Sequence, residues 1–125
     1  MNLADKISNA ELEVMKILWR VKQPVSFTNL RLELQSTKNW GKSTINTLVR
    51  RLAEKGVITS EKREVMYYSP NITEAEYIET ETQGLIDKLY GGNAKNFIAA
   101  LCHGSKLSEN DIDELREYFN KEEIR

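Results

Sequence analysis

The segment around residues 42–56 constrains the fold more than any other part of the chain. Four apolar residues recur there at the spacing of one helix face: Ile45, Leu48, Val49 and Leu52. Gly56 supplies the usual stop for such a helix. Residues 57–62 and 65–69 follow, and both are rich in β-branched and aromatic residues around a short charged turn, which predicts a hairpin.

Two shorter helices are predicted before this unit. Ser8-Asn9-Ala10-Glu11 has the pattern of a capping box and begins a helix that runs to about Val21. A second helix follows a cap at Ser26 or Thr28 and runs to about Leu34. Three helices and then a hairpin is the order of a winged helix–turn–helix domain, in which the third helix enters the major groove of DNA.

The rest of the chain is predicted to be helical, over about 73–90, about 93–103 and from Ser108 onward. The predicted fold is therefore mainly α with a small β-hairpin: a winged-helix DNA-binding domain over 1–70 and a helical dimerisation domain over 71–125. Three short helices bury too little apolar surface to be stable alone, so we expect a second copy of the chain to cover them. Six residues are predicted for the dimer interface or the core beneath it: Leu85, Leu89, Ile98, Leu101, Leu115 and Phe119.

Charge divides the chain at the same place. Residues 20–70 carry ten basic and four acidic side chains, a net charge of +6, and residues 71–125 carry six basic and twelve acidic ones, a net charge of −6. A basic front half suggests a surface for a polyanion, although a solvated basic face is the simpler alternative.

The predicted third helix favours the polyanion surface over the solvated face, because its polar face carries no acidic residue from Lys42 to Arg51. An ordinary solvated helix mixes charges of both signs, whereas short polar side chains and arginines can reach base edges and phosphates. Arg63 at the hairpin tip is a further candidate for a phosphate contact, with a solvated turn as the alternative. The predicted DNA-contacting residues are Lys42, Ser43, Thr44, Asn46, Thr47, Arg50, Arg51 and Arg63.

The sequence offers no constellation for catalysis or metal binding. Cys102-His103 contains the only cysteine and the only histidine. Two neighbouring residues supply at most two ligands, so a cysteine packed in a helix is the better interpretation. We therefore predict no catalytic residue, no metal and no cofactor. No stretch approaches the ~18 apolar residues of a membrane span, and residues 1–6 lack the apolar run of a signal peptide, which favours a cytoplasmic protein.

Three motifs together resemble the penicillinase-repressor family, the winged-helix repressors of β-lactamase and methicillin-resistance genes. The resemblance runs from Ile7 to about Asn120. The motifs are Ile7-Ser8-x-Ala10-Glu11-x-Glu13-Val14-Met15-x-Ile17-x-Trp19, Trp40-x-x-x-Thr44-Ile45-x-Thr47-Leu48-x-x-Arg51-Leu52-x-x-Lys55-Gly56 and Tyr67-Tyr68-Ser69.

The resemblance implies a homodimeric repressor on an inverted-repeat operator, with Ser43, Thr44, Asn46, Thr47 and Arg51 at positions that face DNA. It also implies that a sensor-linked protease releases the repressor by cutting within the dimerisation domain. Alignment with the family places the cut at Ala100–Leu101. The family commonly has a basic residue or glutamine where this chain has Asn46, and its copper-responsive branch has a C-terminal cysteine cluster that is missing here. Alternatives to control of β-lactamase genes are a winged-helix regulator of another operon, a protein-interaction module and a small enzyme.

Overall fold

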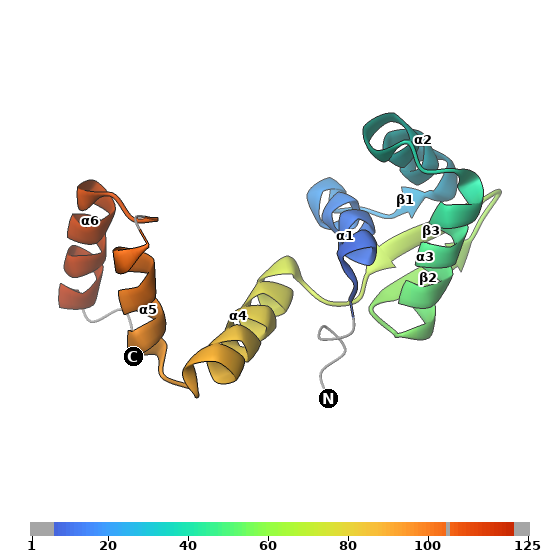
Figure 1. Ribbon diagram of the computed structural model, residues 1–125. Helices are drawn as coiled ribbons and strands as arrows, with labels where there is room; N and C mark the ends of the chain where they lie inside the picture. Colours follow the sequence, from blue (N-terminus) through green and yellow to red (C-terminus); the bar gives the residue numbers. More distant parts are fainter. Residues whose placement is uncertain (1–6, 105, 122–125) are drawn as a thin grey trace. The chain divides into compact units, whose positions relative to one another are not determined.

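The computed structural model describes residues 7–104 and 106–121 and confirms a mainly helical chain with a small sheet. Residues 1–6, on which the localisation prediction depends, lie outside the described residues. None of the described helices is long and apolar enough to cross a membrane. The elements follow in the order α1 (Asn9–Val21), β1 (Val25–Ser26), α2 (Phe27–Lys38), α3 (Lys42–Glu54), β2 (Ile58–Lys62), β3 (Met66–Pro70), α4 (Glu74–Tyr90), α5 (Ala94–His103) and α6 (Glu109–Asn120) (Figure 1).

The first helix begins at the predicted capping box. The Ser8 hydroxyl accepts a hydrogen bond from the Glu11 backbone N–H at 3.1 Å, and the Ser8 N–H donates to Glu11 Oε1 at 2.8 Å. The helix ends at Val21 because Lys22 adopts a left-handed conformation with φ of 62°. This stop comes before Pro24, which restricts the backbone only of the residue directly before it, Gln23.

The second helix is longer than predicted. The Ser26 hydroxyl caps its first turn by accepting from the Asn29 N–H at 3.1 Å. The helix then continues past Leu34, its predicted end, to Lys38, and Asn39 closes it in a left-handed conformation with φ of 58°. Its last turn is polar and exposed, so apolar periodicity could not mark it.

The wing is part of a three-stranded antiparallel sheet in the order β1-β3-β2. The hairpin pairs Ser60 of β2 with Tyr68 of β3, and the opposite edge of β3 pairs Tyr68 with Val25 of β1. The sequence predicted the hairpin and missed β1, because a strand of two residues is too short to show an alternating pattern.

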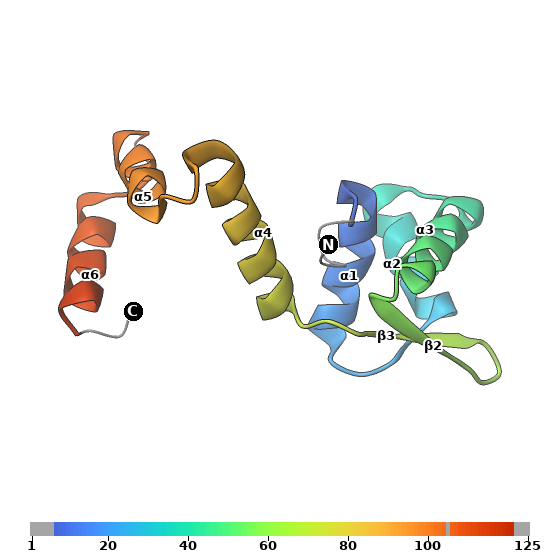
Figure 2. The same ribbon diagram turned by 90° about the horizontal axis from the view of Figure 1, so that it is seen from below.

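The core lies among α1, α2, α3 and the sheet, which pack together in both ribbon views (Figures 1 and 2). The side chains that are essentially inaccessible to solvent include Val14, Met15, Leu18, Leu30, Leu34, Ile45, Leu52 and Val57. The four apolar residues predicted for the inner face of α3 are all buried, so the opposite face of this helix is fixed toward solvent.

The first turns of α4 pack against α1. The indole N–H of Trp19 donates to the Ile72 carbonyl at 2.9 Å, and its ring lies 5.5 Å from that of Tyr77 between centroids. Burial, with the hydrogen bond and charge of Glu81, raises the pKa of Tyr77 to about 12. The chain accordingly divides into two compact units within α4, one ending at Thr82 and the next beginning at Gln83. The sequence had placed its boundary after residue 70.

The second unit contains the end of α4 with α5 and α6. Gly91 and Gly92 make the predicted turn with φ of 59° and 84°, values that favour glycine. Asn93 then caps α5, and Ser108 forms a capping box with Asp111 at the start of α6. Neither α5 nor α6 carries a fully buried side chain, so these two helices leave their apolar residues partly open to solvent, whereas Ile86 of α4 is buried.

Candidate nucleic-acid interface

The outward face of α3 forms an open hollow of about 610 Å³. It is lined by five of the eight residues predicted to contact DNA: Lys42, Ser43, Asn46, Thr47 and Arg50. These side chains share one stripe of the helix, opposite the buried stripe that packs on the core. Thr44 and Arg51 are also exposed on α3 but do not line the hollow, and Arg63 lies apart from them on the wing.

The start of α3 presents backbone donors to this face. Gly41 precedes the helix and has no side chain to cap it, and the first turn contains no acidic residue. The first N–H groups of a helix have no partner within the helix and carry its positive dipole end, which favours a phosphate. Thr47 has a different local role, because its hydroxyl donates to the Ser43 carbonyl at 3.0 Å. That hydroxyl keeps its acceptor capacity.

Ion pairing sorts the ten basic residues of the front half into two groups. Four of them are engaged by carboxylates in the pairs Arg20–Glu33, Lys38–Glu13, Lys55–Glu11 and Arg63–Glu61. Within residues 7–104 and 106–121, the other six have no carboxylate at ion-pairing distance: Lys22, Arg31, Lys42, Arg50, Arg51 and Lys62. Three of these six lie on α3, so the cations that remain available to an external anion are concentrated on the helix that lines the hollow.

The paired cations support the fold instead. Arg20 of α1 donates through both terminal nitrogens to Glu33 of α2, with one contact at 2.8 Å. The hydrogen bond and charge of Arg20 lower the pKa of Glu33 more than burial raises it. Lys55, directly after α3, donates to the buried Glu11 at the start of α1 at 2.6 Å. These contacts tie α2 and the end of α3 to α1 and so hold the candidate interface in place.

Arg63 is held on the wing by neighbouring side chains. Its Nη2 donates to Glu61 Oε2 at 2.9 Å, and its guanidinium lies 4.4 Å from the centre of the Tyr67 ring. The hydrogen bond and charge of Glu61 keep the pKa of Arg63 above its ordinary value. Glu61 and Tyr67 thus restrain Arg63, whereas Lys42, Arg50 and Arg51 of α3 have no carboxylate at ion-pairing distance among the described residues.

Arg31 of α2 is a candidate that the sequence analysis did not name. Its side chain is half-buried, and its Nε is buried without a hydrogen-bond partner in the described part of the chain. A buried donor without a partner is unfavourable by about 1–3 kcal/mol, so an anion beside this guanidinium would be stabilising. In the helix–turn–helix motif made by α2 and α3, the helix before the recognition helix crosses the DNA backbone, so a phosphate could lie beside Arg31. The sequence does not indicate Arg31, because apolar spacing on α2 identifies the buried Leu30 beside it and gives no information about a basic neighbour.

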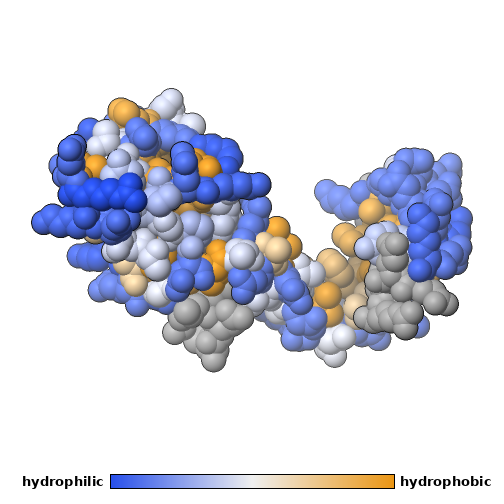
Figure 3. All heavy atoms as spheres, turned by 180° about the vertical axis from the view of Figure 1, so that it is seen from behind, coloured by the Kyte–Doolittle hydropathy of each residue, from blue (hydrophilic) through white to orange (hydrophobic). Residues whose placement is uncertain are grey.

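The predicted interface residues of the second unit lie at or near the surface. Leu85 and Leu89 of α4 and Phe119 of α6 are exposed, and Ile98, Leu101 and Leu115 are half-buried. A groove of about 220 Å³ between α5 and α6 is lined by Ile98, Cys102, Ile112, Leu115, Arg116 and Phe119. Apolar atoms are visible on this part of the surface in Figure 3. Ile78 of α4 and Tyr118 of α6 are also exposed and were not among the predicted interface residues.

Two predictions concern residues of α5, the candidate cleavage site and Cys102. Ala100 and Leu101, the candidate cleavage site, lie half-buried inside the helix, where the Ala100 carbonyl accepts from Gly104 N–H at 2.9 Å. Cys102 was interpreted as packed, and this is wrong: it is exposed and faces the groove between α5 and α6. Among the described residues no cluster of histidine, cysteine or acidic side chains could hold a metal ion.

Comparison with known proteins gives one consistent result. The profile of the penicillinase repressor family matches residues 7–121. The chain is 32% identical over 126 residues to the penicillinase repressor of Bacillus licheniformis, covering 100% of this chain and 98% of that protein. It is 35% identical over 121 residues to the methicillin resistance regulatory protein MecI of Staphylococcus aureus (strain N315), covering 96% of this chain and 98% of MecI.

Solved structures match the front half. The DNA-binding domain of the repressor BlaI is 39% identical with a TM-score of 0.54, covering 62% of this chain and 94% of that one. The monomeric form of Bacillus licheniformis BlaI in complex with the blaP half-operator is 40% identical with a TM-score of 0.51, covering 58% of this chain and 88% of that one.

Proposed function

We infer that this chain, which belongs to the penicillinase repressor family, is a transcriptional repressor that binds double-stranded operator DNA and is not an enzyme. The observation that carries the inference is the outward face of α3. Its unpaired cations and short polar side chains line one hollow, and no acidic residue interrupts them. The relative solved in complex with the blaP half-operator supports operator DNA as the ligand.

We propose that α3 enters the major groove and divides its work between phosphates and bases. Lys42, Arg50 and Arg51 are long cations suited to phosphates or to guanine, and Asn46 can form two hydrogen bonds with adenine. Ser43, Thr44 and Thr47 are short and suited to phosphates or base edges close to the helix. Arg63 of the wing completes the predicted set, with its reach restricted by Glu61.

The second unit is proposed to join two copies of the chain. Its apolar residues on α4, α5 and α6 are exposed or half-buried in one copy, and the predicted interface residues are among them. Two linked wing domains related by a two-fold axis match the two half-sites of an inverted repeat. Once the first domain is bound, the second meets its half-site at an effective concentration that is often millimolar, which raises the affinity.

Release from the operator is proposed to follow proteolysis in α5. A protease needs an extended substrate, so cleavage at Ala100–Leu101 requires the last turn of α5 to open first, including the hydrogen bond from Gly104 to Ala100. Cutting the helix weakens the contact between copies, and the loss of avidity by a factor of ~10²–10⁴ would empty the operator. A sensor-linked protease and β-lactamase genes are the proposed partner and target, with another operon as the alternative.

The test is a titration of the full chain with the DNA upstream of its own gene, against a duplex of the same composition without an inverted repeat, at several salt concentrations. We expect preference for the inverted repeat, and a salt slope that falls by about one for each of Lys42→Gln and Arg50→Gln. Lys88→Gln, which removes an exposed cation from α4 of the second unit, is the matched control and should bind like the parent. Binding without salt dependence or without preference would favour a protein-interaction module instead.

A further inference from the structure

The tip of the wing carries four charges in a row that cancel one another: Glu61, Lys62, Arg63 and Glu64. Arg63 directly follows β2 in the turn of the hairpin, two residues after Glu61, and its guanidinium reaches the Glu61 carboxylate. Tyr67 pairs directly with Glu61 across the two strands. The three side chains therefore meet near the tip of the wing, where Glu61 and Tyr67 both contact Arg63.

These contacts restrict the guanidinium through which Arg63 would bind a phosphate. One terminal nitrogen donates to the Glu61 carboxylate, and one face of the guanidinium lies over the Tyr67 ring. The carboxylate also places a negative charge where a phosphate would approach, and like charges repel. Both side chains keep substantial exposure, 49% for Arg63 and 61% for Glu61, so the pair is open to replacement.

The cations of α3 are in the opposite situation. Lys42, Arg50 and Arg51 are exposed and have no carboxylate at ion-pairing distance among the described residues. Counterion release on binding depends on cations that neutralise phosphates, and a cation already neutralised by its own chain contributes little. The front half thus combines a strongly charged reading helix with a wing whose arginine is neutralised from within.

We propose that Glu61 is a positioning residue that holds Arg63 on Tyr67 and so limits the contribution of the wing to DNA affinity. This inference rests on the proposed function. Its consequence is that α3 governs binding in the parent protein, and that the wing adds a phosphate contact once Glu61 loses its charge.

The test is a double-mutant cycle in the full chain, measured by titration of the operator duplex between 50 and 200 mM salt. Glu61→Gln should bind more tightly with a salt slope larger by about 0.9, so its advantage grows by about 3.5-fold as salt falls from 200 to 50 mM. Arg63→Gln should lower affinity only slightly in the parent. In the Glu61→Gln background it should remove the whole gain.

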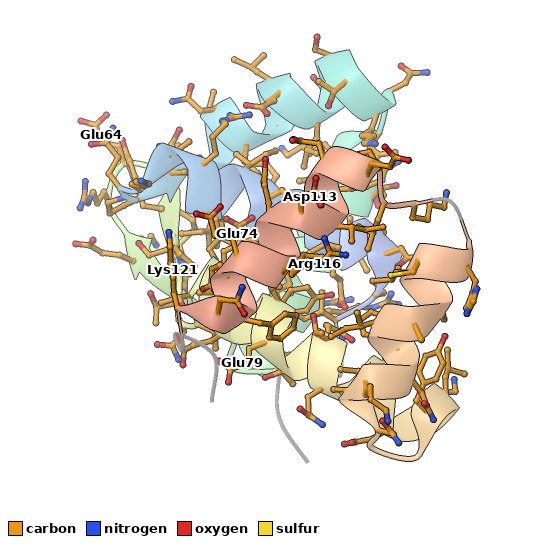
Figure 4. All side chains as sticks on the ribbon, turned by 90° about the vertical axis from the view of Figure 1, so that its left-hand side faces the viewer. Glu64, Glu74, Glu79, Asp113, Arg116 and Lys121 are labelled. Atoms are coloured by element: carbon orange, nitrogen blue, oxygen red, sulfur yellow. The ribbon has the colours of Figure 1, made fainter. Side chains whose placement is uncertain are left out.

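Glu64→Gln is the matched control, because Glu64 is an exposed carboxylate of the same wing tip that forms no ion pair within the described chain (Figure 4). Its effect should be the same with and without Arg63, since general charge repulsion does not depend on a specific partner. Strong coupling between positions 61 and 63 with additivity between 64 and 63 supports the proposal. Equal and additive effects of both glutamate substitutions, or weaker binding by Glu61→Gln, would overturn this proposal. A parent protein that binds no operator would instead overturn the proposed function.

Discussion

Replacing Glu11 with glutamine should destabilise the DNA-binding unit far more than is usual for an acidic residue in the first turn of a helix. Glu11 is only 1% exposed, although it lies in the first turn of α1. Its Oε1 accepts from Lys55 Nζ at 2.6 Å and from the Ser8 N–H at 2.8 Å. Lys55 follows α3 directly, so this carboxylate joins the start of the first helix to the end of the helix that faces DNA.

The size of the effect follows from what remains after the substitution. Removing one partner of a buried ion pair typically costs 3–5 kcal/mol, because the other charge is left unpaired. Here the Lys55 side chain is 27% exposed and can turn toward water, and a glutamine can still accept from Ser8. We therefore expect a loss of about 2 kcal/mol, which lowers the melting temperature of a unit of this size by about 8–16 °C.

The pH dependence has a defined sign. Burial alone would raise the pKa of Glu11, but the hydrogen bonds from Lys55 and Ser8 and the charge of Lys55 together lower it below its ordinary value of 4.5. A carboxyl whose pKa is lower in the folded state stabilises the protein above its unfolded pKa, and this stabilisation is lost as the pH falls through the folded pKa. The difference between the parent and Glu11→Gln should therefore be constant above about pH 5.5 and shrink below pH 4.5.

Urea denaturation of the full chain followed by circular dichroism, from pH 3.5 to 7, measures both effects. Glu13→Gln is the matched control: Glu13 lies on the same helix and pairs with Lys16 and Lys38 at 3.4 Å, but it remains 28% exposed. It should change stability little, because exposed ion pairs are weak. Equal losses for the two variants at pH 7, or a Glu11→Gln difference that grows toward acidic pH, would refute the reasoning.

Three further outcomes are expected. Asn46→Ala should reduce discrimination between the operator and an altered duplex by about 1–3 kcal/mol without changing the salt slope, in competitive titrations. Leu89→Asp should give monomers in sedimentation, whereas Leu32→Asp, at a similarly exposed leucine of α2, should leave assembly unchanged. Trp19→Phe keeps an aromatic side chain but is smaller and loses the hydrogen bond to Ile72, so the free energy of unfolding measured in urea should fall by at least about 1–2 kcal/mol.

Local chemistry in the sequence was enough to predict most of the elements. The capping box at Ser8, the apolar spacing in α3 and the turn at Gly91-Gly92 each fix a backbone conformation through residues a few positions apart. The end of α2 and the strand β1 could not be predicted in this way. The polar last turn of α2 ends at Asn39, and β1 exists because the tertiary fold brings Val25 beside Tyr68.

The candidate site was predictable as a helix face but not as a set of charges. Periodicity placed Lys42, Asn46 and Arg50 on the outward stripe of α3, and the structure brings them together in one hollow. Which cations are already paired depends on side chains from other elements, as for Lys55 with Glu11. The exposure of Cys102 was mispredicted because a shortage of metal ligands favoured a packed cysteine but carries no information about burial, and α5 leaves this side chain exposed.

The pairing of charges explains how one basic domain can both fold stably and bind a polyanion. Cations that hold helices together, such as Arg20 and Lys55, are matched to carboxylates within the unit, so they add stability without adding attraction to DNA. The cations of α3 have no carboxylate partner in the part of the chain that the structure describes, and the core fixes the opposite face of this helix. Removing a cation whose carboxylate partner is buried, such as Lys55, should therefore lower stability first, while removing a cation of α3 should lower DNA affinity alone. This separation distinguishes an interface from a merely basic surface.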